Sequence, residues 1–239
     1  MSAITTDETA VNDRADDQLD PSAYALVSDE EVPAWLRPVI RRSLAGPLPG
    51  LLDRAARQRQ SGSRQSAVLM LLGEGPNGPD LLLTQRASTL RTHAGQPAFP
   101  GGALDPGEDA VAAALREGWE ETGVDPASVQ PLVLMPRLYL PVSEFVVQPV
   151  LAYWREPGPV RAVDPAETEA VARVPIDALA DPANRVHVRL GAFQGPGFRV
   201  AEMLVWGFTG FLIEALLQLG GWEIDWEFEH TTVVELTRP

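Results

Sequence analysis

The sequence predicts an α/β fold, a sandwich in which helices cover a mixed β-sheet. Short apolar and β-branched runs alternate with turn residues along the 239-residue chain, and this pattern is typical of strands. Two longer segments, at residues 109–122 and 204–219, have a helical pattern instead. No internal repeat is present in the sequence, so the strands and helices are expected to form one layered domain.

The first 60 residues are expected to lie outside this domain. Residues 1–31 contain nine acidic residues and one arginine, and they offer too little apolar surface to offset the entropy of ordering. We therefore expect a disordered acidic tail. Residues 32–60 are expected to form a helical arm of one or two short amphipathic helices, interrupted at Pro47 and Gly50. The main domain then extends over residues 61–239.

Strand-like runs occupy most of the main domain. SAVLMLLG at 66–73 and DLLLTQR at 80–86 are joined by the turn-rich EGPNGP, which predicts a hairpin with an extended loop. Further strands are expected at 130–140 and 145–154. RVPIDALADP then predicts the end of a strand and a short helix, and RVHVRL with FRVAEML predicts a late hairpin.

The first long helix is predicted over residues 109–122. Pro106 and Gly107 mark a turn before it, acidic residues stand at its start, and Gly123 is a suitable stop. At about 100° per residue, its apolar stripe defines the buried face. That face is expected to consist of Val111, Ala114, Leu115, Gly118 and Thr122.

The second long helix is the most apolar part of the chain. MLVWGFTGFLIEALLQL at 203–219 contains Glu214 and is shorter than the roughly 20 apolar residues of a membrane span. We expect a buried core helix that ends at Gly220 and Gly221, and no membrane association.

Composition excludes several classes of function. A formal net charge of −14 disfavours nucleic acid as a partner, because phosphate-backbone binding depends on lysine and arginine. A polyanionic ligand would need a local basic patch or bound cations. The absence of cysteine excludes disulfides, thiolate nucleophiles and cysteine-bound metals. The first residues lack the features of a secretory signal, so a cytoplasmic location is expected.

Three carboxylates stand close together on the first helix. Glu117 and Glu121 are one turn apart, with Glu120 beside them, so their side chains are expected to converge away from the buried face. Such a cluster is costly unless a cation compensates it, and Mg²⁺ takes oxygen ligands from one or two carboxylates plus substrate phosphates. A lone acidic helix face would more simply be solvated. Here, however, glycines and charged residues flank the three glutamates at fixed spacings, which a solvated acidic face does not require.

This spacing resembles the Nudix box. Gly102, five residues, Glu108, seven residues, Arg116-Glu117, two residues, Glu120-Glu121, one residue and Gly123-Val124 match its charged and glycine positions. The resemblance implies a Nudix α/β/α sandwich and Mg²⁺- or Mn²⁺-dependent hydrolysis of a nucleoside diphosphate linked to another group. Gly118 departs from the aliphatic residue or alanine of the family, at an expected cost to the helix of about 0.5–1 kcal/mol.

The resemblance also implies roles for individual residues. Glu117 and Glu121 would be the main metal ligands, with Glu120 a further ligand or a catalytic base. Gly102 would offer its backbone carbonyl to the metal. Arg116 would form an orienting ion pair with Glu108 and so belong to the catalytic set.

The segment before the box narrows the substrate. LLLTQRASTLRTHAGQPAFPGG at 81–102 resembles the segment that precedes the Nudix box in coenzyme A pyrophosphatases, with Ala87 where serine is usual. Weaker similarity continues at 140–150, where Glu144 stands in place of glycine, and at 204–216. The likeness therefore extends over most of the chain from residue 68 to residue 217.

Arg86, Arg91 and His93 form a cationic cluster within this segment. Arginine suits bidentate phosphate recognition, and coenzyme A carries a 3′-phosphate besides its diphosphate. Both arginines are candidates for substrate binding, and structural pairing with loop carbonyls or carboxylates is equally open. His93 is a candidate for substrate binding too, although a hydrogen bond to the loop backbone is the simpler interpretation.

An additional catalytic base is expected in the acidic segment 164–175, where Glu167 or Glu169 would lie across from the helix. Glu169 is our candidate, and a solvated loop is the alternative.

Together these features predict a cytoplasmic, metal-dependent Nudix pyrophosphatase. It would cleave coenzyme A or its derivatives to 3′,5′-ADP and 4′-phosphopantetheine, and it would act as a possible homodimer. One alternative is hydrolysis of ADP-ribose or another nucleoside diphosphate derivative. The other is a non-catalytic Nudix domain that senses a ligand, which the retained charge cluster disfavours.

Overall fold

The computed structural model describes residues 25–45, 64–90, 92–141, 143–225 and 232–236. The expected tail up to residue 24 and the second helix of the expected arm lie outside these residues, as does Arg91.

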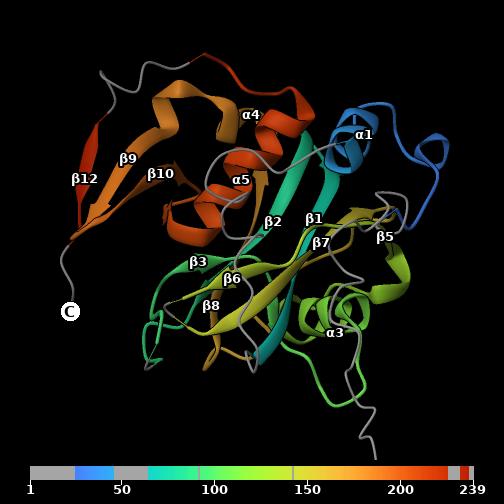
Figure 1. Ribbon diagram of the computed structural model, residues 1–239, viewed down its shortest axis with the longest axis horizontal. Coiled ribbons are helices and arrows are strands. Elements are labelled where there is room, and N and C mark those ends of the chain that lie inside the picture. Colours follow the sequence, from blue (N-terminus) through green and yellow to red (C-terminus); the bar gives the residue numbers. More distant parts are fainter. Residues whose placement is uncertain (1–24, 46–63, 91, 142, 226–231, 237–239) are drawn as a thin grey trace, which may run out of the picture.

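A mixed sheet forms the centre of the described structure (Figure 1). Its main path has the order β3-β2-β1-β7-β5, and β4, β6 and β8 pair with β1, β7 and β2. β1 pairs antiparallel with β2 and parallel with β7. The strands of this sheet are β1 (Arg64–Gly75), β2 (Gly78–Arg86), β3 (Pro97–Ala98), β4 (Gly101–Ala103), β5 (Val129–Leu134), β6 (Leu138–Leu140), β7 (Phe145–Trp154) and β8 (Thr168–Pro175).

The side chains of β1 divide between two hydrophobic clusters because successive residues of a strand face opposite sides. Leu69 and Leu71 pack in the cluster under α3, whereas Met70 and Leu72 pack in the cluster under α1, α4 and α5. The expected α/β/α sandwich is therefore confirmed. Its helices are η2 (Asp29–Glu31), α1 (Arg37–Ala45), α3 (Ala110–Thr122), η3 (Pro126–Ser128), α4 (Ile176–Ala180), η4 (Pro182–Asn184) and α5 (Gly207–Gly220).

A second, smaller sheet lies beside α5, at the left of Figure 1. The buried Arg185 of this sheet donates a hydrogen bond to Glu214 on α5 and lies over the ring of Phe198. These contacts fix the sheet against the helix. Its strands, in the order β11-β10-β9-β12, are β9 (Arg185–Leu190), β10 (Phe193–Val200), β11 (Met203–Val205) and β12 (Val233–Glu235).

Several predicted elements differ from those observed. The first hairpin closes more tightly than expected, since Gly75 pairs with Gly78. The run 130–140 forms two strands rather than one, with Pro136 between them, because proline has no N–H for a strand ladder. The last helix begins at Gly207, not residue 204, since residues 203–205 pair with β10.

Part of the segment expected to be a disordered tail packs on the domain. Ala25 forms a bridge with Val133, and the Leu26 N–H donates to the carbonyl of Leu132. After this bridge, α1 packs against α5. The ordered structure thus begins before residue 32.

Among the described helices, none is both long and apolar enough to cross a membrane.

Candidate active site

α3 is capped at both ends by its own sequence. The Asp109 carboxylate accepts the N–H of Ala112 at 2.8 Å, and Gly123 adopts a left-handed φ of 74° that closes the C-terminus. The loop after β7 adds two more bonds, from the N–H groups of Arg161 and Val163 to the last carbonyls of the helix. The predicted helix boundaries are confirmed.

The buried face of α3 agrees with the predicted stripe. Ala113, Ala114, Gly118 and Thr122 are buried, and Val111 and Leu115 pack partly buried beside them. At Gly118 an added Cβ would lie 2.7 Å from Cδ2 of Leu69. The absence of a side chain at Gly118 therefore lets the helix approach β1. The sequence predicted only that this glycine would weaken the helix, and the packing role is seen in the structure alone.

The glycine loop lies directly against the acidic face of α3. Gly101 and Gly102 belong to β4, which pairs with β1, and a Cβ on Gly102 would collide with the Glu117 carboxylate. The N–H of Gly101 hydrogen-bonds the carboxylate of Glu121. A Cβ on Gly101 would instead collide with the Ala67 carbonyl and with Val68 of β1, so one glycine admits the Glu117 carboxylate and the other admits the neighbouring strand.

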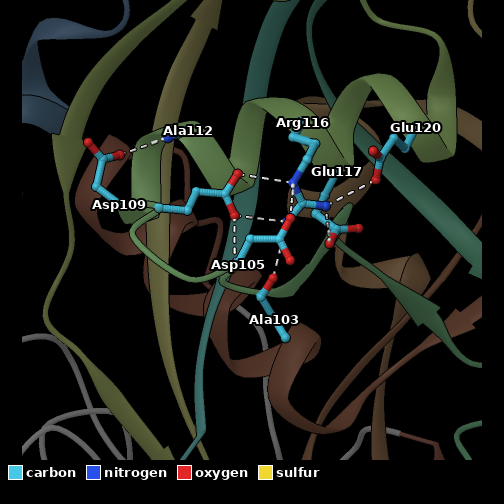
Figure 2. A network of polar contacts seen from close by, with 8 residues as sticks. Ala103, Asp105, Asp109, Ala112, Arg116, Glu117 and Glu120 are labelled. Carbon is cyan, nitrogen blue, oxygen red and sulfur yellow. Dashed lines mark hydrogen bonds and ion pairs between the residues drawn. The ribbon is translucent and has the colours of Figure 1, made fainter.

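Arg116 holds the loop and the helix together (Figure 2). Its Nε and Nη2 each donate to Glu108 at 3.0 Å, and Nη2 also donates to the Ala103 carbonyl at 3.1 Å. Its Nη1 donates to Glu117 at 2.9 Å and to Glu120 at 3.0 Å. The hydrogen bond from Arg116 lowers the pKa of Glu108, and the bond to Glu108 is the largest cause of a raised pKa at Arg116. The expected ion pair between Arg116 and Glu108 is present.

Glu117 and Glu121 are carboxylates held under electrostatic strain. Burial, followed by the charge of Glu117, raises the pKa of Glu121 to about 8, although Arg86 and the Gly101 N–H oppose the change. Burial also raises the pKa of Glu117, against the effect of Arg116. Two half-buried acids whose pKa stays raised despite the nearby Arg116 and Arg86 fit a site for a hard divalent metal ion.

Arg116 holds two of the three box carboxylates, so they do not form the bare acidic cluster that the sequence predicts. No cluster of three or more acidic, histidine or cysteine side chains suited to a metal occurs in the described residues. The reason is that Arg116 binds both Glu117 and Glu120, and Glu120 remains 47% exposed. Glu117 and Glu121 are thus the pair that fits a metal, with room for substrate oxygens as the remaining ligands.

The loop before the box brings one of its cations to this pair. Arg86, at the end of β2, lies close enough for its charge to lower the pKa of Glu121. His93 is exposed, adopts a left-handed φ of 55°, and contacts Oε1 of Gln96 through Nδ1 at 2.9 Å. In this structure His93 orders its own loop, and Arg91 lies outside the described residues.

The acidic segment after β7 acts on the site through the charge of Glu167, one of the two glutamates named from the sequence. Glu169 is exposed and accepts the N–H of Ser88 at 3.2 Å. Glu167 instead raises the pKa of both Glu117 and Glu121 by its negative charge. The alternation of β8 cannot reveal this, because Glu167 precedes the strand in a turn bonded to Asp164.

Comparison with known proteins identifies what this chain is similar to. The family model described as NUDIX domain matches residues 63–192. The uncharacterized Nudix hydrolase NudL of Escherichia coli (strain K12 / DH10B) is 40% identical over 164 residues, which cover 66% of this chain and 83% of NudL. NudL of Shigella boydii serotype 4 matches to the same extent. A solved Nudix hydrolase from M. smegmatis, RenU, covers 52% of this chain and 78% of its own, at 26% identity and a TM-score of 0.42.

The chain belongs to the Nudix family and is a Nudix hydrolase, a pyrophosphatase acting on phosphoric anhydrides. The expected family, fold class and enzyme class are confirmed.

Proposed function

We propose that this Nudix hydrolase cleaves coenzyme A or a derivative of it to 3′,5′-ADP and 4′-phosphopantetheine. The observation that carries the proposal is the path of residues 81–102. This segment has the pattern seen before the Nudix box in coenzyme A pyrophosphatases, and it leads from Arg86 beside Glu121 to Gly102 against Glu117. The segment expected to select the substrate thus borders the carboxylates that would serve its diphosphate.

Glu117 and Glu121, with the Gly102 carbonyl, would hold Mg²⁺ or Mn²⁺. Such a cation, when bound, neutralises the diphosphate and makes a coordinated water more acidic. The protein groups supply position and charge around it. Arg116 fixes the Glu117 carboxylate from one side, and Arg86 offers a guanidinium for a substrate phosphate.

We assign proton transfer from the attacking water to a carboxylate beside this pair. Glu120 is tied to Arg116 at 3.0 Å, and Glu169 is tied to the Ser88 N–H. Glu167 accepts no hydrogen bond through its side chain within the described residues, and its charge reaches both Glu117 and Glu121. Glu167 therefore replaces Glu169 as our candidate base.

Product analysis tests the proposal. The purified protein is incubated with Mg²⁺ or Mn²⁺ and, separately, with coenzyme A, ADP-ribose and NADH, and the products are separated by chromatography. We expect 3′,5′-ADP from coenzyme A only when metal is present. The Glu121→Gln variant should lose at least about 100-fold in rate, whereas Glu156→Gln, at an exposed glutamate after β7, should retain full activity.

The other outcomes separate the alternatives. Turnover of ADP-ribose or NADH in place of coenzyme A would refute the substrate assignment while retaining the metal site. Equal activity of Glu121→Gln and the wild type would refute the metal site itself.

A further inference from the structure

A hollow separate from the carboxylate site lies at the junction of the two sheets, next to the loop that precedes the Nudix box. Its volume is about 320 Å³, which is within the range of small-molecule sites. One wall comes from residues 94–97 and Gln85 of the central sheet, and the other comes from the second sheet and the start of α5. The apolar side chains of this second wall include Leu190, Met203, Leu204, Trp206 and Leu236.

Gln85 and Gln96 line this hollow, and the amide group of each has unused hydrogen-bonding capacity. Gln85 donates through Nε2 to the Gly95 carbonyl at 3.4 Å, so its Oε1 is available to accept. The Oε1 atom of Gln96 contacts Nδ1 of His93, so the Nε2 group of Gln96 is available to donate a hydrogen bond. No other hydrogen bond of these two amide groups occurs within the described part of the chain. The hollow therefore offers one donor and one acceptor between apolar walls, which matches a secondary amide in an aliphatic chain.

The charge of the hollow excludes the phosphorylated part of a nucleotide. Among the residues that line it, Glu202 is the charged one, and no arginine, lysine or histidine takes part. A phosphate placed here would meet a carboxylate without a compensating cation. The occupant that fits is uncharged, with both amide and aliphatic groups.

The hollow and the carboxylate site meet at the end of β2. Gln85 lines the hollow, and the next residue, Arg86, acts on Glu121. The pairing of β2 with β8 shifts its register between these two residues. Pro97 in the hollow and Gly101 beside Glu121 are four residues apart, a separation of at most about 14 Å along the chain. One extended ligand could reach both places around the edge at β3.

We propose that this hollow binds the pantetheine arm of the substrate while the diphosphate lies at Glu117 and Glu121. This inference rests on the proposed function, because it identifies the pantetheine arm as the part of coenzyme A that the protein recognises in the hollow. The pantetheine amides pair with Gln85 and Gln96, and its dimethyl group packs against the wall that includes Leu204. For a substrate without this arm, the hollow contributes nothing to the binding affinity.

Binding of pantetheine alone tests the hollow independently of catalysis. Full-length protein labelled with ¹⁵N is titrated with pantetheine in the absence of metal, and the indole signals of its tryptophans are followed by NMR. We expect the signal of Trp206, assigned through Trp206→Phe, to shift, and that of Trp119 on α3 to stay in place. Leu204→Glu should weaken the titration roughly tenfold, and the matched control Ile224→Glu, at an exposed site outside the hollow, should leave it unchanged.

Kinetics with the same two variants give the second measurement. Leu204→Glu should raise KM for coenzyme A roughly tenfold with little change in kcat, and inhibition by 3′,5′-ADP should remain as in the wild type. An unshifted Trp206 signal, or equal weakening of pantetheine and 3′,5′-ADP, would overturn the inference. If Trp206 responds but coenzyme A is not hydrolysed, the hollow stands and the proposed function fails.

Discussion

Gly118 shows how one residue sets the distance between the catalytic helix and the sheet. Helix propensity alone marks it as a defect in α3, because glycine is less favourable than alanine by roughly 1 kcal/mol. In the structure, however, the position faces the fully buried Leu69. Since α3 carries Glu117 and Glu121, the same close approach places those carboxylates against the glycine loop of β4.

Gly118→Ala is therefore expected to destabilise the protein although it improves helix propensity. A Cβ at this position would lie 2.7 Å from Cδ2 of Leu69, and overpacking of this kind costs typically about 1–3 kcal/mol. Urea unfolding of the single variant measures the effect, and the Gly118→Ala/Leu69→Ala double variant tests its cause, because the smaller residue relieves the collision. A gain of stability in the single variant would contradict the packing argument.

The acidic residues of the site show which residue-level assignments the sequence supports. The resemblance of the residues from Gly102 to Val124 to the Nudix box implied the Arg116–Glu108 pair, and both ends of that pair belong to α3 and its preceding turn. Spacing did not distinguish Glu167 from Glu169, because their distances to α3 depend on how β8 pairs with β2. That pairing joins residues that lie 82 (Arg86 with Thr168) to 95 (Asp80 with Pro175) positions apart in the sequence.

The C-terminus of α5 is an element whose stability depends on another element. Its last carbonyls lack partners within the helix, and Arg42 of α1 donates through Nη1 to the carbonyls of Gln218 and Leu219 at 3.2 Å each. The N-terminal helix thus acts as a cap for the C-terminal one. It also closes the hydrophobic cluster on this side of the sheet.

We expect Arg42→Met to lower the free energy of unfolding by about 0.5–1.5 kcal/mol, the usual contribution of such hydrogen bonds. Methionine retains the aliphatic part of the side chain and removes the donors. Chemical denaturation measures the change, with Arg199→Met as a control that removes the same charge from an exposed position on β10. If both variants lose equal stability, the effect comes from net charge and not from the cap.

Element boundaries were predicted well where the signal was local. Asp109 and Gly123 fixed both ends of α3, because capping depends on residues within one turn of each end. The start of α5 was wrong by three residues, since apolar periodicity cannot show that residues 203–205 are taken by the second sheet. A tight hairpin with β10 overrode the local helical preference there.

At the scale of the whole molecule, the buried carboxyl of Glu121 couples the stability of the fold to pH. The chain has a net charge of −14, and the pKa of Glu121 is raised to about 8 by burial and by Glu117. A carboxyl whose pKa is higher in the folded than in the unfolded state stabilises the fold at low pH. That contribution is lost as the pH rises from the ordinary value near 4.5 through the folded value.

The metal-free protein should accordingly lose thermal stability as the pH rises from about 5 to about 8. Bound Mg²⁺ compensates the ionised carboxylates, so the gain in Tm on adding Mg²⁺ should grow with pH. Calorimetry with EDTA or Mg²⁺ across this range measures both effects. Glu121→Gln should flatten the pH dependence and remove most of the Mg²⁺ effect, whereas a metal-induced gain that is independent of pH would contradict this account.

Some expectations for the whole molecule stay predictions. The homodimer, the cytoplasmic location and the tail before residue 25 concern partners, surroundings or residues outside the described structure. The substrate also stays at the level of a proposal, because the relatives are identified as Nudix hydrolases and not by what they cleave.

The sequence by itself determined the family, the catalytic helix with its caps, the Arg116–Glu108 pair and most strand positions. These features depend on residues close together in the chain, where spacing translates directly into geometry. Only the tertiary structure decided that the charge of Glu167 acts on Glu117 and Glu121, and that a hollow opens between the two sheets. Each of these depends on the packing of segments distant in sequence, and burial and long-range pairing are properties of the folded chain as a whole.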